Sequence, residues 1–98
     1  MISWAKVEQL QNQTLEMLTH RKRFTIVEVS NGNVYFVPDN GAGTRRWVTR
    51  AMLEHIAAQD WAATDLRPKR IAGEYPSDRN SSYMAAILNA VMKPRVRA

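Results

Sequence analysis

Short clusters of basic side chains are the residues of this sequence best suited to chemistry. The first cluster consists of Arg21, Lys22 and Arg23, and the second of Arg45, Arg46, Trp47 and Arg50. No acidic residue lies within either cluster. Guanidinium groups match the geometry of phosphate oxygens, and an exposed indole can stack on a base. The clusters therefore predict contact with a nucleic acid, with phosphates rather than base edges as the main target.

Two further expectations concern the surroundings of these clusters. We expect the Trp47 indole to be buried, with the neighbouring arginines available to a ligand. Arg79 and Asn80 precede a segment predicted to be helical, whose free N–H groups would favour an anion. Capping by Asn80 and an ion pair between Arg79 and Asp78 explain the same residues equally well.

The whole chain carries an excess of positive charge. Fourteen Lys and Arg side chains oppose nine Asp and Glu, which gives a formal net charge of +5. We therefore predict a non-catalytic nucleic-acid-binding accessory module, with DNA as its partner. The alternative is a protein-interaction adaptor or inhibitor whose basic surface meets an acidic partner protein. A basic surface that only faces solvent is the simplest explanation of the same charges.

No motif for catalysis or metal binding is present. The chain has no cysteine, which excludes disulfides, thiolate metal sites and a cysteine nucleophile. Neither His20 nor His55 has a second histidine at metal-ligand spacing, and the acidic residues are scattered. We predict that the protein is not an enzyme and needs no cofactor.

Length and composition indicate one small globular domain. The 98 residues, 45% of them hydrophobic, suffice for a single core. Residues 1–98 are predicted to form one domain with a short basic tail from about residue 94. No apolar run reaches the length of a membrane span, and the first residues lack the apolar segment of a signal peptide. We expect a cytoplasmic protein without membrane contact; the sequence leaves its oligomeric state open.

The segment from Ser81 to Met92 is predicted to be the central helix of the core. Met84, Ile87, Leu88 and Val91 recur in it at helical spacing. A helix this apolar cannot lie free on a surface, so the rest of the domain must pack around it.

A helix is also predicted at the N-terminus. Ser3 is a suitable N-cap because its side-chain oxygen can accept from the first turn. The residues expected on one face of this helix are Trp4, Val7, Leu10, Thr14, Met17 and Leu18. We expect the helix to end near Thr19.

The clearest local signal is a β-hairpin. Two runs rich in β-branched and aromatic residues, 24–29 and 34–37, flank Asn31-Gly32, the dipeptide favoured in type I′ turns. Pro38 is expected to end the second strand because it cannot donate to a ladder.

A two-residue loop fixes the predicted register. It pairs Val29 with Val34 and Val27 with Phe36, and these four residues are expected to face the core. Glu28 would then lie opposite Tyr35 on the other face, nearer solvent.

A third strand and another helix are predicted next. Residues 45–48 are expected to form the strand, and Thr49 to cap a helix that ends near Gln59 or Asp60. Val48 and Leu53 have the spacing of a hydrophobic staple. Residues 61–76 are expected to be a connector in which Pro68 ends a single helical turn.

The predicted class is α+β. A small antiparallel sheet packs against three helices in the order α-β-β-(β)-α-α, where the bracketed strand is the third. Arg21–Arg23 and Arg45–Arg50 would then lie at the two ends of the sheet.

Three short motifs resemble a small accessory module. They are Phe24-Thr25-Ile26-Val27, Arg46-x-Val48-x-Arg50 and Arg79-Asn80-Ser81-Ser82-Tyr83-x-Ala85-Ala86-Ile87-Leu88. Modules of this kind occur in uncharacterised bacterial proteins and beside nuclease domains of restriction-type enzymes. The resemblance covers about residues 24–91 and implies a DNA-associated, non-catalytic role, with Tyr83, Ile87 and Leu88 as structural signature positions. The double-stranded RNA-binding domain has a similar α-β-β-β-α order, but the lysine-rich start of its second helix is absent here.

Overall fold

The protein combines one antiparallel sheet with four helices in the part of the chain that the structure covers. The computed structural model describes residues 2–17, 22–39, 43–59, 68–75 and 79–92. The elements are α1 (Trp4–Glu8), β1 (Thr14–Glu16), β2 (Arg23–Ser30), β3 (Asn33–Pro38), β4 (Arg46–Thr49), α2 (Arg50–Ala57), α3 (Pro68–Glu74) and α4 (Ser81–Val91). The sheet has the strand order β1-β2-β3-β4, each strand antiparallel to its neighbour. The predicted α+β class is confirmed.

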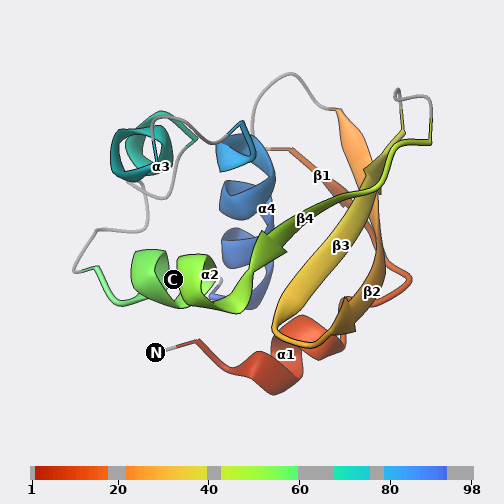
Figure 1. The fold of residues 1–98 in the computed structure, drawn as a ribbon, viewed down its shortest axis with the longest axis horizontal. Helices are drawn as coiled ribbons and strands as arrows, with labels where there is room; N and C mark the ends of the chain where they lie inside the picture. Colours follow the sequence, from red (N-terminus) through yellow and green to blue (C-terminus); the bar gives the residue numbers. More distant parts are fainter. Residues whose placement is uncertain (1, 18–21, 40–42, 60–67, 76–78, 93–98) are drawn as a thin grey trace, which may run out of the picture.

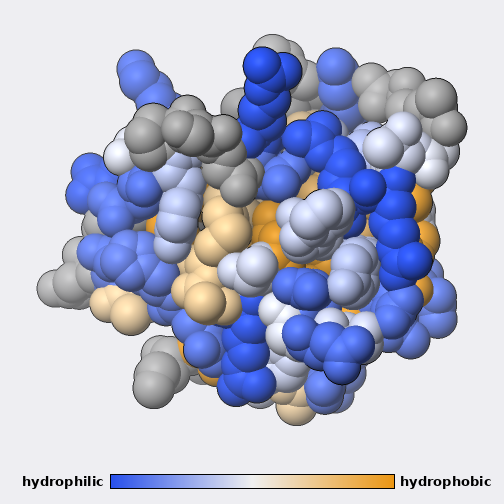
Figure 2. Space-filling model, in the orientation of Figure 1, coloured by the Kyte–Doolittle hydropathy of each residue, from blue (hydrophilic) through white to orange (hydrophobic). Residues whose placement is uncertain are grey.

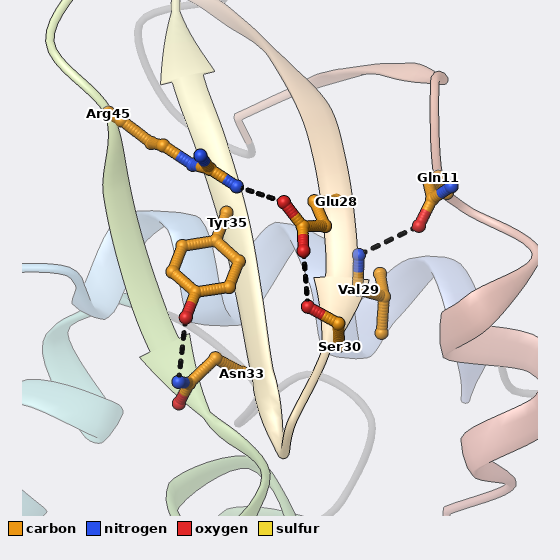
Figure 3. Close-up of polar contacts among 7 residues, drawn as sticks. All are labelled: Gln11, Glu28, Val29, Ser30, Asn33, Tyr35 and Arg45. Atoms are coloured by element: carbon orange, nitrogen blue, oxygen red, sulfur yellow. Dashed lines mark hydrogen bonds and ion pairs between the residues drawn. The ribbon is translucent and has the colours of Figure 1, made fainter.

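The helices and the sheet form two layers. Helix α4 contacts α1, α2, α3 and strand β1, so it lies at the centre of the helical layer (Figure 1). Among the described residues, no helix covers the opposite face of the sheet (Figure 3). No helix in the described ranges is long and apolar enough to span a membrane.

The central helix is confirmed as the centre of the core. Met84, Ile87 and Leu88 have no exposed surface. Tyr83, at the start of α4, packs its ring 4.5 Å from that of Phe36, which is itself fully buried on β3. Burial of this apolar surface is the main stabilising contribution to the fold.

The predicted long N-terminal helix is wrong. Helix α1 ends at Glu8, and Asn12 has a φ of +71°, a left-handed conformation that asparagine tolerates better than most residues. The backbone of Asn12 instead donates to the Ile26 carbonyl at 2.6 Å. Beyond it, Leu15 and Met17 alternate with exposed neighbours and pack against the core, as in a strand.

The cap of α1 also differs from the expectation. Ser3 occupies the N-cap position, but its side chain makes no capping hydrogen bond. Only its carbonyl takes part, accepting from the amides of Lys6 and Val7.

The hairpin turn is confirmed, and the register is confirmed in part. Asn31 and Gly32 have φ values of +53° and +75°, as a type I′ turn requires. Val29 pairs with Val34, and Glu28 pairs with Tyr35. Pro38 is the last residue of β3.

A bulge changes the register beyond Glu28. Phe36 pairs with Ile26 rather than Val27, because the pairing shifts between Ile26 and Glu28. The extra residue moves Ile26 and Phe24 onto the core face, where both are fully buried. The predicted core position of Val27 is therefore wrong.

The third strand and its following helix match the prediction. Thr49 Oγ1 accepts from the Met52 amide at 3.1 Å and caps α2, and both staple residues, Val48 and Leu53, are fully buried. The predicted connector is wrong in part, since Pro68 begins a helix rather than ending one. Proline suits the first helical position because a backbone N–H there has no hydrogen-bond partner within the helix, so its absence loses no bond. The predicted turn before Pro68 and the C-terminal tail lie outside the described residues.

Candidate functional site

The helix-free face of the sheet carries a row of polar and aromatic side chains. Glu28 on β2 lies opposite Tyr35 on β3, which lies opposite Trp47 on β4. The Arg45 side chain extends over Tyr35 toward Glu28 (Figure 3). We call the surface formed by Glu28, Ser30, Tyr35, Arg45 and Trp47 the open face.

Trp47 is exposed, contrary to the prediction that it is buried. It keeps 55% of its surface accessible and is the one large hydrophobic residue exposed among those described. The cause is strand alternation: Val48 points into the core, so its neighbour must point outward. The ring centroids of Trp47 and Tyr35 lie 6.5 Å apart with planes tilted by 46°.

Trp47 lines two hollows of the surface. One, of about 340 Å³, lies on the open face and is lined by Glu28, Ser30, Asn31, Tyr35, Arg45 and Trp47. The other, of about 270 Å³, lies at the free edge of β4 and is lined by Arg45, Arg46, Trp47, Thr49, Met52 and Asn80. Trp47 and Arg45 line both hollows, so they form the centre of the site.

The surrounding surface offers little other apolar area. In Figure 2 it is mostly hydrophilic, and hydrophobic residues are visible mainly near the middle, close to where β4 and α4 approach each other in Figure 1. An extended apolar patch of the kind that marks protein interfaces is not visible on this side.

Arg45 and Glu28 form an ion pair that the sequence did not indicate. The Arg45 guanidinium donates to Glu28 and lies 4.3 Å from the Tyr35 ring centroid. Ser30 donates its hydroxyl to the second oxygen of Glu28. The Ser30 hydrogen bond and the Arg45 guanidinium lower the pKa of Glu28 below its ordinary value of 4.5. Glu28 is therefore ionised at neutral pH and offsets part of the positive charge of Arg45.

Arg46 and Arg50 lie in different surroundings. Arg46 stacks over Tyr83 at 5.1 Å, and no carboxylate among the described residues forms an ion pair with it. Arg50 pairs with Glu54 at 2.8 Å. Arg50 follows the other end of β4, so the predicted second cluster is divided between the two ends of this strand.

Of the first predicted cluster, Lys22 and Arg23 lie at the same end of the sheet as Arg45 and Arg46. Strands β2 and β4 run in the same direction with β3 between them, so Arg23 and Arg46 both start a strand at that end. The prediction that the two clusters lie at opposite ends is wrong. Glu16 on β1 is the cross-strand neighbour of Arg23. Lys22 is exposed, and Arg21 lies outside the described residues.

Arg79 and Asn80 bring the start of α4 to this site. The Asn80 side-chain amide donates to the Trp47 carbonyl at 3.2 Å, and Asn80 makes no side-chain capping bond to α4. Arg79 precedes it and is exposed. The predicted ion pair with Asp78 involves a residue outside the described ranges.

The chemistry available to this arrangement is charge contact and stacking. Within the described part of the chain, no group of three or more His, Cys, Asp or Glu side chains could hold a metal ion. His55 lies beside Glu74, with 3.0 Å between Nε2 and Oε1. Arg46 and Arg79 offer cations, and Trp47 offers an exposed ring face.

Glu28, Ser30 and Tyr35 belong to the open face but were not among the predicted site residues. Glu28 and Tyr35 were expected on the solvent side of the hairpin, so the alternation of the strand already indicated their direction. Their pairing with Trp47 and Arg45 depends on the third strand, whose register no local motif specifies.

No protein-family model matches this chain, and no curated protein or solved structure matches it either. The resemblance to the accessory module found beside restriction-type nuclease domains stays a prediction.

Proposed function

We propose that the protein is a non-catalytic nucleic-acid-binding module with DNA as its partner, and that Arg45, Arg46 and Arg79 contact phosphates around Trp47. One observation carries the proposal. Trp47 is exposed and lines two hollows together with Arg45, at an edge of the sheet where the charged lining residues are mainly arginines. Nucleic-acid-binding surfaces combine cationic side chains that contact phosphates with aromatic rings that stack on bases.

The three arginines do not contribute equally. Arg45 already pairs with Glu28, whereas Arg46 and Arg79 have no ion pair with a carboxylate among the described residues. Lys22 and Arg23 extend the basic surface at the same end of the sheet, two strand spacings or about 10 Å from β4. So few cations predict weak, sequence-tolerant and strongly salt-dependent binding.

The wider context belongs to the same proposal. The resemblance of the three short motifs supports an association with restriction or other DNA processing. A cytoplasmic location is consistent with such a role. An adaptor or inhibitor that binds an acidic protein would use the same cations. Titration with DNA distinguishes this function from nucleic-acid binding.

The test is a titration of a short labelled DNA duplex between about 50 and 200 mM salt. Three phosphate contacts predict a log–log slope of about −2.7 for the wild type, and Arg46→Ala is expected to flatten it by about 0.9. Lys69→Ala is the matched control, since it removes the same charge from α3, outside the sheet. The control is expected to bind like the wild type.

Two results would contradict the proposal. The first is no binding by the wild type at the lowest salt, which would make an acidic partner protein the better hypothesis. The second is an equal effect of Arg46→Ala and Lys69→Ala, which would show that only net charge matters.

Glu28 gives an independent test with the opposite sign. Glu28→Gln removes the negative charge of the open face and releases Arg45, so it is expected to tighten binding. The Glu28 side chain is exposed to solvent, which screens its repulsion of a phosphate, so the expected increase in affinity is small. Glu74→Gln changes the net charge equally on α3 and is expected to have no such effect. If both variants tighten binding alike, the open face is not the binding surface.

A further inference from the structure

We infer that the open face and the adjoining edge of β4 bind single-stranded DNA, with one unpaired base stacked on the Trp47 indole. The inference rests on the proposed function and adds to it the kind of nucleic acid that is preferred.

Trp47 is exposed and lies beside open space. The residue keeps 55% of its surface accessible and lines both hollows, of about 340 and 270 Å³. In a duplex, both faces of a base are covered by the neighbouring base pairs. An unpaired base has a free face, so a solvent-exposed indole discriminates in favour of single strands.

Trp47 is the ring available for stacking, and Tyr35 is not. The Arg45 guanidinium lies 4.3 Å from the centroid of the Tyr35 ring and occupies one face of it. The sheet lies behind the other face (Figure 3). A single base at Trp47, with its flanking phosphates near Arg46 and Arg79, is the arrangement that the geometry favours.

The polar groups of the open face are already bonded to one another. Glu28 accepts from Arg45 and Ser30, and the Asn33 side-chain amide donates to the Tyr35 hydroxyl at 3.0 Å (Figure 3). Because these groups are bonded to one another, we do not expect them to form specific hydrogen bonds with base edges. The stacking is therefore expected to tolerate any base. The proposed stacking and phosphate contacts make no use of a 2′-hydroxyl, so we expect DNA to bind at least as tightly as RNA.

The charges around Trp47 favour a nucleic acid strand over a peptide. The hollow at the edge of β4 holds Arg45 and Arg46 without any carboxylate in its lining. A strand carries a phosphate at every nucleotide, which matches cations on both sides of a single stacking ring.

The experiment compares four ligands of equal length, about ten nucleotides. They are oligothymidine, a strand of the same length made of abasic sites, a DNA duplex and oligouridine RNA. The abasic strand keeps the phosphates and lacks the bases, so it isolates the contribution of stacking. Affinities are measured at low salt for the wild type, Trp47→Phe and Trp47→Ala.

The wild type is expected to bind oligothymidine about tenfold more tightly than the abasic strand. It should also bind oligothymidine more tightly than the duplex. Trp47→Ala is expected to abolish the difference between oligothymidine and the abasic strand, and Trp47→Phe to keep part of it. Because the wild-type comparison is decisive by itself, a variant that fails to fold leaves the test intact.

The outcomes separate this inference from the proposed function. Equal binding of oligothymidine and the abasic strand overturns the stacking and leaves the phosphate contacts standing. Tighter binding of the duplex overturns the single-strand preference, and tighter binding of oligouridine than of oligothymidine overturns the choice of DNA. Absence of binding to all four ligands refutes the proposed function as well and points to a protein partner.

Discussion

Truncation of Leu88 to alanine is the most direct test of the core. Leu88 has no exposed surface and lies in the middle of α4, within the single cluster that contains the buried residues of the sheet. Removing three buried carbon groups costs about 2.4 kcal/mol in transfer free energy. A residual cavity of about 40 Å³ adds roughly 1 kcal/mol. We therefore expect Leu88→Ala to lower the free energy of unfolding by about 3.5 kcal/mol.

The assay is urea unfolding followed by circular dichroism. The slope with denaturant should stay constant while the midpoint falls, because the surface exposed on unfolding hardly changes. Ala90→Ser in the same helix is the control; Ala90 is exposed, and the change should cost no more than about 0.5 kcal/mol. A loss below about 1 kcal/mol for Leu88→Ala would show that α4 is not the centre of the core.

Two further predictions concern the hairpin. Gly32→Val should destabilise the fold by about 1–3 kcal/mol, because Gly32 has a φ of +75° and its surroundings are open, so the cost arises from the backbone alone. Gly73 lies in the helix α3 and also has open space around it. Gly73→Ala should therefore be neutral or stabilise the fold by up to about 1 kcal/mol. Thermal unfolding of both variants checks this contrast. The second prediction is a pH effect. Hydrogen bonding by Ser30 and the charge of Arg45 lower the pKa of Glu28 in the folded state, so ionised Glu28 stabilises the fold. This stabilisation is present above pH 4.5 and is lost as the pH falls through the lowered pKa. Glu28→Gln should thus be less stable than the wild type at pH 7 and equal to it in strong acid, and a difference independent of pH would contradict the ion pair.

Much of the fold could be predicted because its signals are local. The apolar spacing of Met84, Ile87 and Leu88 specifies a buried helix, and Asn31-Gly32 specifies the hairpin turn. The N-terminal segment could not be assigned, since Trp4, Val7 and Leu10 follow a helical stripe that the following residues also fit. Pairing of the Asn12 backbone with Ile26 is a tertiary contact, and it overrides that local pattern.

The candidate site could be predicted only in its parts. The Arg50–Glu54 pair has helical i,i+4 spacing and was readable from the sequence. The outward direction of Trp47 follows from strand alternation once Val48 is known to be buried, but the sequence alone led us to expect a buried indole. The Arg45–Glu28 pair could not be predicted, because it joins β2 to the residue before β4, and β3 lies between these two strands.

The central claim is that nucleic acid binds at Trp47 and the adjoining edge of β4. The most direct measurement is an amide and indole NMR titration of ¹⁵N-labelled protein with oligothymidine. The chain has three tryptophans, so three indole N–H signals report separate positions. We expect the Trp47 indole signal to shift most, together with the amides of Arg46 and Asn80, while the Trp4 indole and the amides of α3 stay in place. Shifts confined to other surfaces, or none at low salt, would contradict binding at Trp47.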